Sequence, residues 1–325
     1  MIWIDGGKIA DPTPREGALR VEGATINGKA LRAPPEARCI DARGLFLVPA
    51  FVDAHVHLTV AGEVALVARE ELRGGVAAVL DLGAPEKLLP LDARPLRTRF
   101  SGPLLTAPQG YPTQTWGKDG HGLCVTTPEE GRAAVRRLAD TGARFAKLAF
   151  DARFPQLAPE VAKAAAEEAH RLGMLVAAHA LDGDAVRRAL DAGADVLAHT
   201  PNDLLPKDLA SRLRGKWVIS TLRAFGVEPR RLRALREAGA RIAYGTDLGN
   251  EGTRPGIDPL ELKAIAAAGV DPIRAATEEA AALLGLRDMG RLSVGSAASL
   301  LAVRALDPDS LARPVWVMNN GKMVV

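Results

Sequence analysis

Cysteine and long apolar runs are scarce in this chain, and each shortage excludes a class of protein. Of 325 residues only Cys39 and Cys124 are cysteine, far apart and at no zinc or redox spacing. We expect two small buried residues rather than a nucleophile or a disulfide, although sequence alone leaves pairing open. No stretch of about 18 uninterrupted apolar residues occurs, so we expect no membrane span.

The chain also lacks a large excess of charge of either sign. Lys and Arg number 42 against 39 Asp and Glu, a net charge of +3, and no basic run is interleaved with aromatic residues. We therefore expect no nucleic-acid partner. The first residues show no basic segment followed by an apolar stretch, so we expect no signal peptide and a cytoplasmic protein.

The two ends of the chain have a β pattern. Short apolar pieces alternate with turn signals, among them Asn27-Gly28 near the start and Asn320-Gly321 near the end. Asn-Gly between apolar stretches is a strong hairpin signal. We predict that residues 1–47 and 291–325 pair into one small β-sandwich domain that flanks a central domain of residues 48–290.

The central part alternates strands with helices, and no GxGxxG sequence leads from a strand into a helix. Eight apolar stretches have strand character: Leu45–His57, Val76–Asp81, Pro103–Ala107, Arg144–Phe150, Met174–His179, Asp195–His199, Trp217–Ser220 and Arg241–Asp247. Alternation on this scale predicts an α/β fold with a parallel sheet, and eight units predict a closed (β/α)8 barrel of the TIM type.

The stretch VPAFVDAHVHL, residues 48–58, holds two histidines one residue apart. Side chains of a strand alternate between its faces, so Asp53, His55 and His57 point to the same side. Neutral imidazole is a common zinc donor, and two imidazoles at the end of an apolar strand predict a metal site. A surface or hydrogen-bonded histidine pair is the alternative.

Polar residues recur where other predicted strands end. Lys147 lies in RFAKLAF, the fifth strand ends at His179 in LVAAHA, His199 ends DVLAH, and Asp247 ends IAYGTD. In a barrel these ends open on one mouth, where active sites sit. Four of the six histidines in the chain occupy such positions, so we expect these residues to form one site.

These motifs, in this order, resemble the amidohydrolase superfamily and its imidazolonepropionase- and prolidase-like branch. VPAFVDAHVHL resembles its first metal motif, GARFAKLAF its bridging-lysine strand, and HALDGDAVRRALDAGADVLAHT and YGTD its later histidine and aspartate motifs. The C-terminal AGVDPIRAATEEAAALLGLRDMGRLSVGSAASLLAV resembles its return to the β-domain. Ala50 and Ser299 depart from the usual Gly and Asp, and neither removes a ligand.

The resemblance implies two divalent metal ions, with zinc as the expected metal. One ion would take His55, His57 and Asp247, and the other His179 and His199. Lys147, carboxylated by carbon dioxide, would bridge them together with a hydroxide. An ammonium beside two dications would be repelled, whereas a carbamate is an anionic ligand. The alternative is an unmodified Lys147, snorkelling or paired with Asp151 or Asp247, in a single-metal site.

Further roles follow for residues around these ligands. Asp247 is the expected proton carrier, with a ligand-only role as the alternative. Asp53 is a candidate support for a ligand histidine, or else part of a core salt bridge. His121 and Tyr111 are candidate substrate contacts on loops. Arg223 could meet a substrate carboxylate, but a solvated arginine is the simpler reading.

The function expected from this resemblance is hydrolysis of an amide or peptide-type C–N bond in a small-molecule substrate. A prolidase-like dipeptidase is the first prediction, and a cyclic amide or lactone hydrolase the second. A mononuclear deaminase would need a glutamate near the third histidine, and ALDGD after His179 has none. A non-catalytic barrel would have lost ligands, yet all six positions are filled. Short loops after the fourth and fifth strands predict an open pocket or one completed by a second copy in a homo-oligomer.

Overall fold

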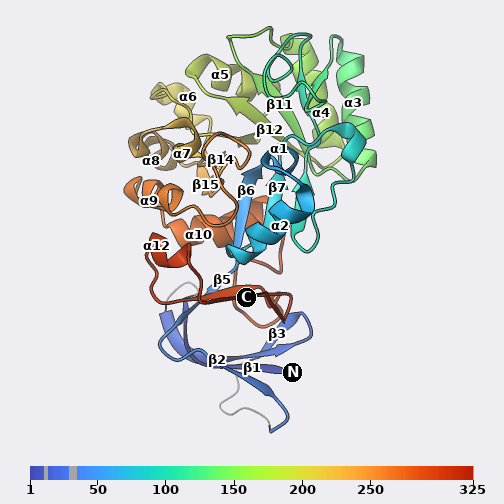
Figure 1. Cartoon of the computed structure of the whole chain (residues 1–325). Coiled ribbons are helices and arrows are strands. Elements are labelled where there is room, and N and C mark those ends of the chain that lie inside the picture. Colours follow the sequence, from blue (N-terminus) through green and yellow to red (C-terminus); the bar gives the residue numbers. More distant parts are fainter. Residues whose placement is uncertain (11–13, 29–34, 325) are drawn as a thin grey trace.

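The computed structural model describes residues 1–10, 14–28 and 35–324. Its chain forms a large body of strands and helices, with a sheet below it that is built from both ends of the chain (Figure 1). Blue N-terminal strands and red C-terminal strands lie together there. None of the described helices is long and apolar enough to cross a membrane.

The lower sheet joins the two ends, as predicted. Its strand order is β18-β17-β16-β5-β1-β2-β3, and β4 also pairs with β1. The strands are β1 (Ile2–Ala10), β2 (Pro14–Glu22), β3 (Thr25–Gly28), β4 (Arg38–Asp41), β5 (Phe46–Pro49), β16 (Leu300–Val303), β17 (Trp316–Asn319) and β18 (Lys322–Met323). They are connected as one hydrogen-bonded sheet. Its division into the two layers of a sandwich and the domain limits at 47 and 291 stay predictions.

The predicted hairpin at Asn320-Gly321 connects β17 to β18, where Asn319 pairs with Lys322. Both turn residues have positive φ, 48° and 74°, as the two-residue turn favoured by Asn-Gly requires.

The body consists of parallel strands in two sheets. One has the order β6-β7-β8 and the other β10-β9-β11-β12-β13-β14-β15. Its strands are β6 (Phe51–Val56), β7 (Val76–Asp81), β8 (Arg97–Phe100), β9 (Leu104–Thr106), β10 (Gly122–Cys124), β11 (Phe145–Phe150), β12 (Leu175–Ala180), β13 (Val196–Leu197), β14 (Trp217–Ile219) and β15 (Arg241–Ala243).

Helices cover the outside of these strands (Figure 1). They include α2 (Val64–Arg73), α3 (Pro128–Asp140), α4 (Pro159–Arg171), α5 (Gly183–Ala192), α6 (Lys207–Ser211), α7 (Leu222–Phe225), α8 (Pro229–Glu237), α9 (Pro259–Ala267), α10 (Pro272–Arg274) and α11 (Ala280–Leu283). The short α1 (Leu58–Ala61) follows β6, and α12 (Pro308–Leu311) lies between β16 and β17. Thr127 begins α3 with a capping box, its side chain accepting from the amide of Glu130.

Backbone hydrogen bonds join both edges of the three-stranded sheet to the seven-stranded sheet. The Ala54 amide donates to the Tyr244 carbonyl over 3.0 Å, and the Asp247 amide to the His55 carbonyl over 2.8 Å. At the other edge the Arg144 amide donates to the Phe100 carbonyl over 3.1 Å. These bonds place β6 beside the segment after β15 and β8 beside the start of β11.

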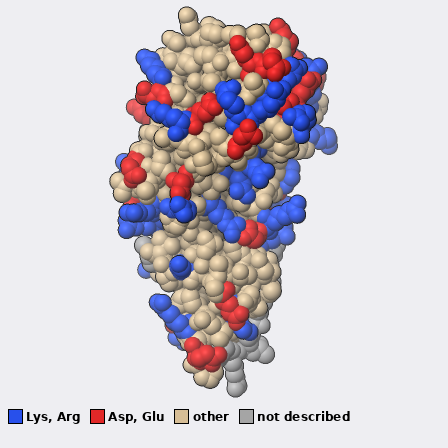
Figure 2. Space-filling model, turned by 90° about the vertical axis from the view of Figure 1, so that its right-hand side faces the viewer, with Lys and Arg blue, Asp and Glu red and all other residues tan. Residues whose placement is uncertain are grey.

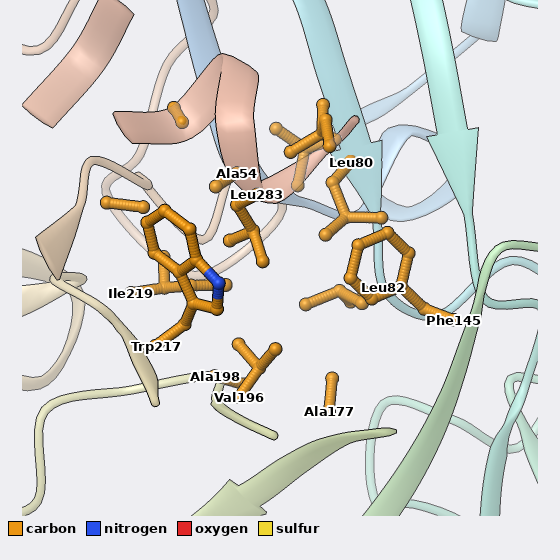
Figure 3. Close-up of a cluster of buried hydrophobic side chains, with 14 of the residues drawn as sticks. Ala54, Leu80, Leu82, Phe145, Ala177, Val196, Ala198, Trp217, Ile219 and Leu283 are labelled. Carbon is orange, nitrogen blue, oxygen red and sulfur yellow. The ribbon is translucent and has the colours of Figure 1, made fainter. Parts of the chain in front are cut away.

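Apolar side chains fill the space beneath the carboxyl ends of the strands. Figure 3 shows Ala54 of β6, Leu80 of β7, Phe145 of β11 and Ala177 of β12 in one cluster with Trp217 of β14. The cluster packs the strands together and gives the polar strand ends above it a fixed support.

The prediction of one continuous strand over Leu45–His57 was wrong, because the structure has two strands there. The chain passes from the lower sheet to the body at Ala50, between β5 and β6. Both halves are buried, so no polar residue marks the break.

Further differences from the predicted strands include the end of β15 and the presence of β8. Regular pairing in β15 ends at Ala243, and the rest of the predicted Arg241–Asp247 strand is irregular. β8, Arg97–Phe100, was not predicted because three of its four residues are polar, which hides a strand from a search for apolar runs.

Both cysteines are exposed and free, so the expectation of two buried residues was wrong, although the absence of a disulfide agrees with it. Cys124 ends a strand at the outer edge of its sheet. An edge strand leaves side chains open to solvent.

Titration of the native protein with an aromatic disulfide reagent should therefore report about two reactive thiols per chain, because exposed thiolates react readily. Cys39→Ser and Cys124→Ser should each remove one equivalent. A native protein that reacts only after unfolding would contradict the exposure of these residues.

Candidate metal centre

Six buried side chains from five parts of the body converge at the carboxyl ends of the strands. They are His55 in β6, His57 just after it, Lys147 in β11, His179 in β12, His199 after β13 and Asp247 after β15. All are at most 8% exposed. Parallel strands bring their carboxyl ends to one mouth, which explains why residues almost 200 positions apart meet.

Three potential metal-ligand atoms lie close together in this group. The Nε2 atoms of His55 and His57 are 3.3 Å apart, and they lie 3.1 and 3.3 Å from Oδ1 of Asp247. These are the three residues that the resemblance assigns to one ion.

A second pair adjoins the first group. Nδ1 of His179 lies 3.0 Å from Nε2 of His199, and His199 also belongs to a cluster with His55 and Asp247 whose ligand atoms lie within 4.8 Å of one another. The two groups are therefore parts of one centre.

Several of these buried atoms have no hydrogen-bond partner among the residues that the structure describes. They include Asp247 Oδ1, His179 Nε2, His57 Nδ1 and Lys147 Nζ. Burial without a partner costs free energy. Burial also lowers the pKa of His179 to about 3 and the pKa values of His55 and His199 well below the usual range. Neutral imidazoles and a carboxylate with free lone pairs fit a divalent metal.

The ring of His55 is held in one tautomer. Its Nδ1 lies 2.9 Å from the Ala198 carbonyl oxygen, which can only accept, so Nδ1 carries the proton. Nε2 is left with its lone pair facing Asp247 and His57. An outer hydrogen bond of this kind orients a ligand histidine.

Lys147 is 1% exposed, and burial lowers the pKa of its amine to about 7. The alternative pairing with Asp151 is not found: Asp151 accepts from Arg153, with Nη2 and Oδ2 2.7 Å apart. Lys147 Nζ has no hydrogen-bond partner among the described residues, Asp247 included. A buried amine that is neutral part of the time suits reaction with carbon dioxide.

Asp53 supports the centre through the backbone rather than through a ring. Its carboxylate accepts from the amide of His55 over 2.9 Å, from the amide of Thr246 over 3.1 Å and from the Thr246 hydroxyl over 2.6 Å. It thereby ties β6 to the segment that carries Asp247. Neither of the predicted forms, a bond to a histidine ring or a core salt bridge, occurs among the described contacts.

Two residues of the centre have left-handed backbone conformations. Asp247 has a φ of 56° and Thr221 a φ of 40°. Aspartate tolerates this region, whereas a β-branched residue rarely adopts it. The Oγ1 atom of Thr221 lies 3.1 Å from Nδ1 of His199, so the strained residue also positions a candidate ligand, and strain of this kind is common at functional sites.

Gly245 permits the close approach of β6 to the Asp247 segment. A Cβ atom there would lie 2.4 Å from Ile219 Cγ2 and 3.1 Å from the His55 amide nitrogen. Gly245→Ala should lower the free energy of unfolding by about 1–3 kcal/mol through overpacking and weaken zinc binding, as measured by urea unfolding and metal titration.

Gly183→Ala is the matched control, because a Cβ there meets nothing closer than 3.8 Å. It should leave both quantities close to their original values. Equal stability of the two variants would contradict the tight contact at Gly245.

A cavity of about 310 Å³ opens above the centre and is walled by aromatic residues. Tyr111 stacks on His179 with ring centres 4.3 Å apart. Trp116 lies 4.7 Å from His57, and Phe225 lies 4.5 Å from His199. Each of these three histidine rings thus packs against an aromatic ring. One of these aromatic residues is Tyr111, which was predicted as a substrate contact.

Two other predicted contacts lie away from the cavity wall. Nε2 of His121 lies 3.1 Å from Thr59 Oγ1, with the His121 ring 5.4 Å from Trp116, and it is not a lining residue. Arg223 donates to Asp258 over 2.6 Å and to the Gly252 carbonyl over 2.9 Å, so it is an ion-paired residue.

The sequence analysis missed Trp116, Phe225 and Asp81. Trp116 lies in the same loop as Tyr111, and an aromatic residue in a polar loop could have indicated a substrate contact. Asp81 ends the predicted strand Val76–Asp81, the same position as the other site residues, and it accepts from the amides of Leu58 and Gly83 over 2.8 and 3.0 Å. Phe225 follows β14 in α7, and no sequence pattern marked it.

A family model described as the amidohydrolase family matches residues 46–325. The chain belongs to the amidohydrolase family. This confirms the resemblance predicted from the motifs and places the chain among hydrolytic enzymes that act on C–N bonds.

Similar proteins agree with this placement. An imidazolonepropionase of Streptomyces coelicolor is 28% identical over 347 residues, covering 90% of this chain and 86% of that protein. A Bifidobacterium longum structure assigned as a prolidase is 25% identical with a TM-score of 0.80, covering 99% of this chain and 94% of the other. A dihydroorotase of Anaeromyxobacter sp. strain K is 34% identical over 89 residues, 24% of this chain and only 21% of the dihydroorotase.

Proposed function

We propose that the protein is a metal-dependent hydrolase of an amide or peptide-type C–N bond in a small molecule, built on a closed (β/α)8 barrel. One observation carries this proposal: nitrogen and oxygen atoms of four histidines and Asp247 face one another in a buried centre, and several of them have no hydrogen-bond partner within the described part of the chain. Family membership supports the reaction class.

The residues present fit two divalent ions, with zinc as the proposed metal. His55, His57 and Asp247 would hold one ion, and His179 and His199 the other, with carboxylated Lys147 between them. When bound, such ions act as Lewis acids toward a carbonyl group and acidify water.

Asp247 is the proposed proton carrier. Its carboxylate faces the cavity, and Asn250 Nδ2 donates to its Oδ2 over 3.2 Å. That contact orients the carboxylate so that it can accept a proton during attack and pass it to the leaving nitrogen.

Two classes of substrate are proposed for this centre. The prolidase-like structure favours a dipeptide. The imidazolonepropionase relative favours a cyclic amide, and a lactone would use the same chemistry.

A substrate screen of the zinc-loaded protein separates these alternatives. Dipeptides, linear amides, lactams and lactones would be compared, and ammonia release would detect deamination. We expect hydrolysis of at least one class of amide, lost with a chelator and restored by zinc. Ammonia release from amino-substituted rings with no amide cleavage would overturn the proposed reaction.

A further inference from the structure

Outside the metal centre, the side chains that line the aromatic cavity carry no positive charge. Besides Lys147 of the metal centre, no lysine or arginine of the described chain lines it, and its rim carries Glu251 and Asn250. Its remaining walls are apolar or aromatic: Val60, Leu104, Tyr111, Trp116 and Phe225.

Two arginines close in sequence to site residues, Arg153 and Arg223, already have partners. Arg153 donates to both carboxylate oxygens of Asp151, with Nε–Oδ1 and Nη2–Oδ2 distances of 3.0 and 2.7 Å. Arg223 is bound to Asp258 and to the Gly252 carbonyl. Because each guanidinium is already neutralised in this way, a substrate carboxylate would find no free counter-charge among these residues and would lie near Glu251. Like charges brought together at a binding site are strongly unfavourable.

Tyr111 supplies a neutral hydrogen bond instead. Its hydroxyl oxygen accepts from Trp116 Nε1 over 2.8 Å, and the described residues provide no acceptor for the hydroxyl hydrogen. This proton is available to the oxygen of an uncharged carbonyl group.

We propose that this cavity selects uncharged amides that carry a planar apolar group, which packs against Trp116, Tyr111 and Phe225, and that it discriminates against substrates with a free carboxylate beside the scissile bond. The proposal rests on the amide hydrolysis proposed above and defines its substrate class. It favours a neutral substrate over the dipeptide predicted first.

Matched substrates test the selection by charge. In N-benzoylglycine and its methylamide the benzoyl–nitrogen bond is the same, and only the second carries no free carboxylate. Similar acid and amide pairs of other acyl groups complete the panel. For the zinc-loaded protein we expect kcat/KM for acyl release to be at least about tenfold higher for the neutral members.

Reversing the charge of Glu251 at the cavity rim tests whether that charge causes the preference for neutral substrates. Glu251→Lys should raise kcat/KM for the acids and narrow the ratio within each pair. Glu237→Lys is the control, since α8 ends there just before β15 begins, at the end of the barrel opposite the site. It should leave the ratio unchanged. Acids hydrolysed as well as their amides, or a ratio that Glu251→Lys does not move, would overturn the proposal.

A binding measurement separates this proposal from the proposed function. Benzohydroxamate should raise the Tm of the zinc-loaded protein at a concentration about tenfold lower than 4-carboxybenzohydroxamate. If this preference holds while no amide in the panel is cleaved, the hydrolase assignment fails and the cavity's selectivity stands. If amides are cleaved without the preference, the substrate class fails alone.

Discussion

Asp247→Asn should lower kcat by about 10²–10⁴-fold, the range typical of lost general acid–base catalysis. The asparagine oxygen can still face His55 and His57, so the variant should keep part of its zinc. It cannot accept a proton from the attacking group. Steady-state kinetics and elemental analysis of the same preparation measure both effects.

Asp191→Asn is the matched control for this substitution. Asp191 lies on α5, where it is exposed and accepts from Arg212 over 2.8 Å. This variant should retain normal turnover. Near-normal turnover in Asp247→Asn would remove Asp247 from the proton path and leave it a ligand only.

Lys147→Met should lower turnover by about 10²-fold or more and reduce bound zinc from about two ions per chain to about one. Methionine has a similar length and fits the buried position, so loss of the fold is not expected. It cannot be carboxylated, and the bridge between the two groups of ligands would be lost. Zinc content, kcat and thermal unfolding distinguish these effects.

A chemical rescue sharpens the test of Lys147. Lys147→Ala leaves a space at the buried position, and a small carboxylate such as acetate should restore part of the zinc and part of the activity. Two zinc ions and full activity in Lys147→Met would support an unmodified lysine without a bridging role.

The convergence of the candidate metal ligands could be predicted from the sequence because parallel strands share one polarity. Except for Lys147 in the middle of β11, each candidate ligand stands near or just beyond the carboxyl end of an apolar stretch. A correct prediction of strands such as Met174–His179 was therefore enough to bring His179 to the mouth. Asp247 was placed correctly although its strand ends four residues earlier, because backbone hydrogen bonding to His55 replaces the regular pairing.

The cavity wall could not be predicted in the same way. The positions of Trp116 and Phe225 depend on how loops fold over the centre, and that is decided by distant contacts. Glu261, for example, accepts from the amides of Leu222 and Arg223 over 3.0 and 2.7 Å and fixes the start of α7. No local pattern around Phe225 signals this contact. The exposure of the cysteines depends in a similar way on sheet edges, which apolar periodicity does not indicate.

Zinc titration of the metal-free protein in the presence of bicarbonate tests the central claim most directly. Amide hydrolysis should be absent at the start and should rise with added zinc, reaching a plateau at about two ions per chain. A protein that binds no zinc under these conditions, or that cleaves amides equally well without metal, would contradict a metal-dependent hydrolase at this centre.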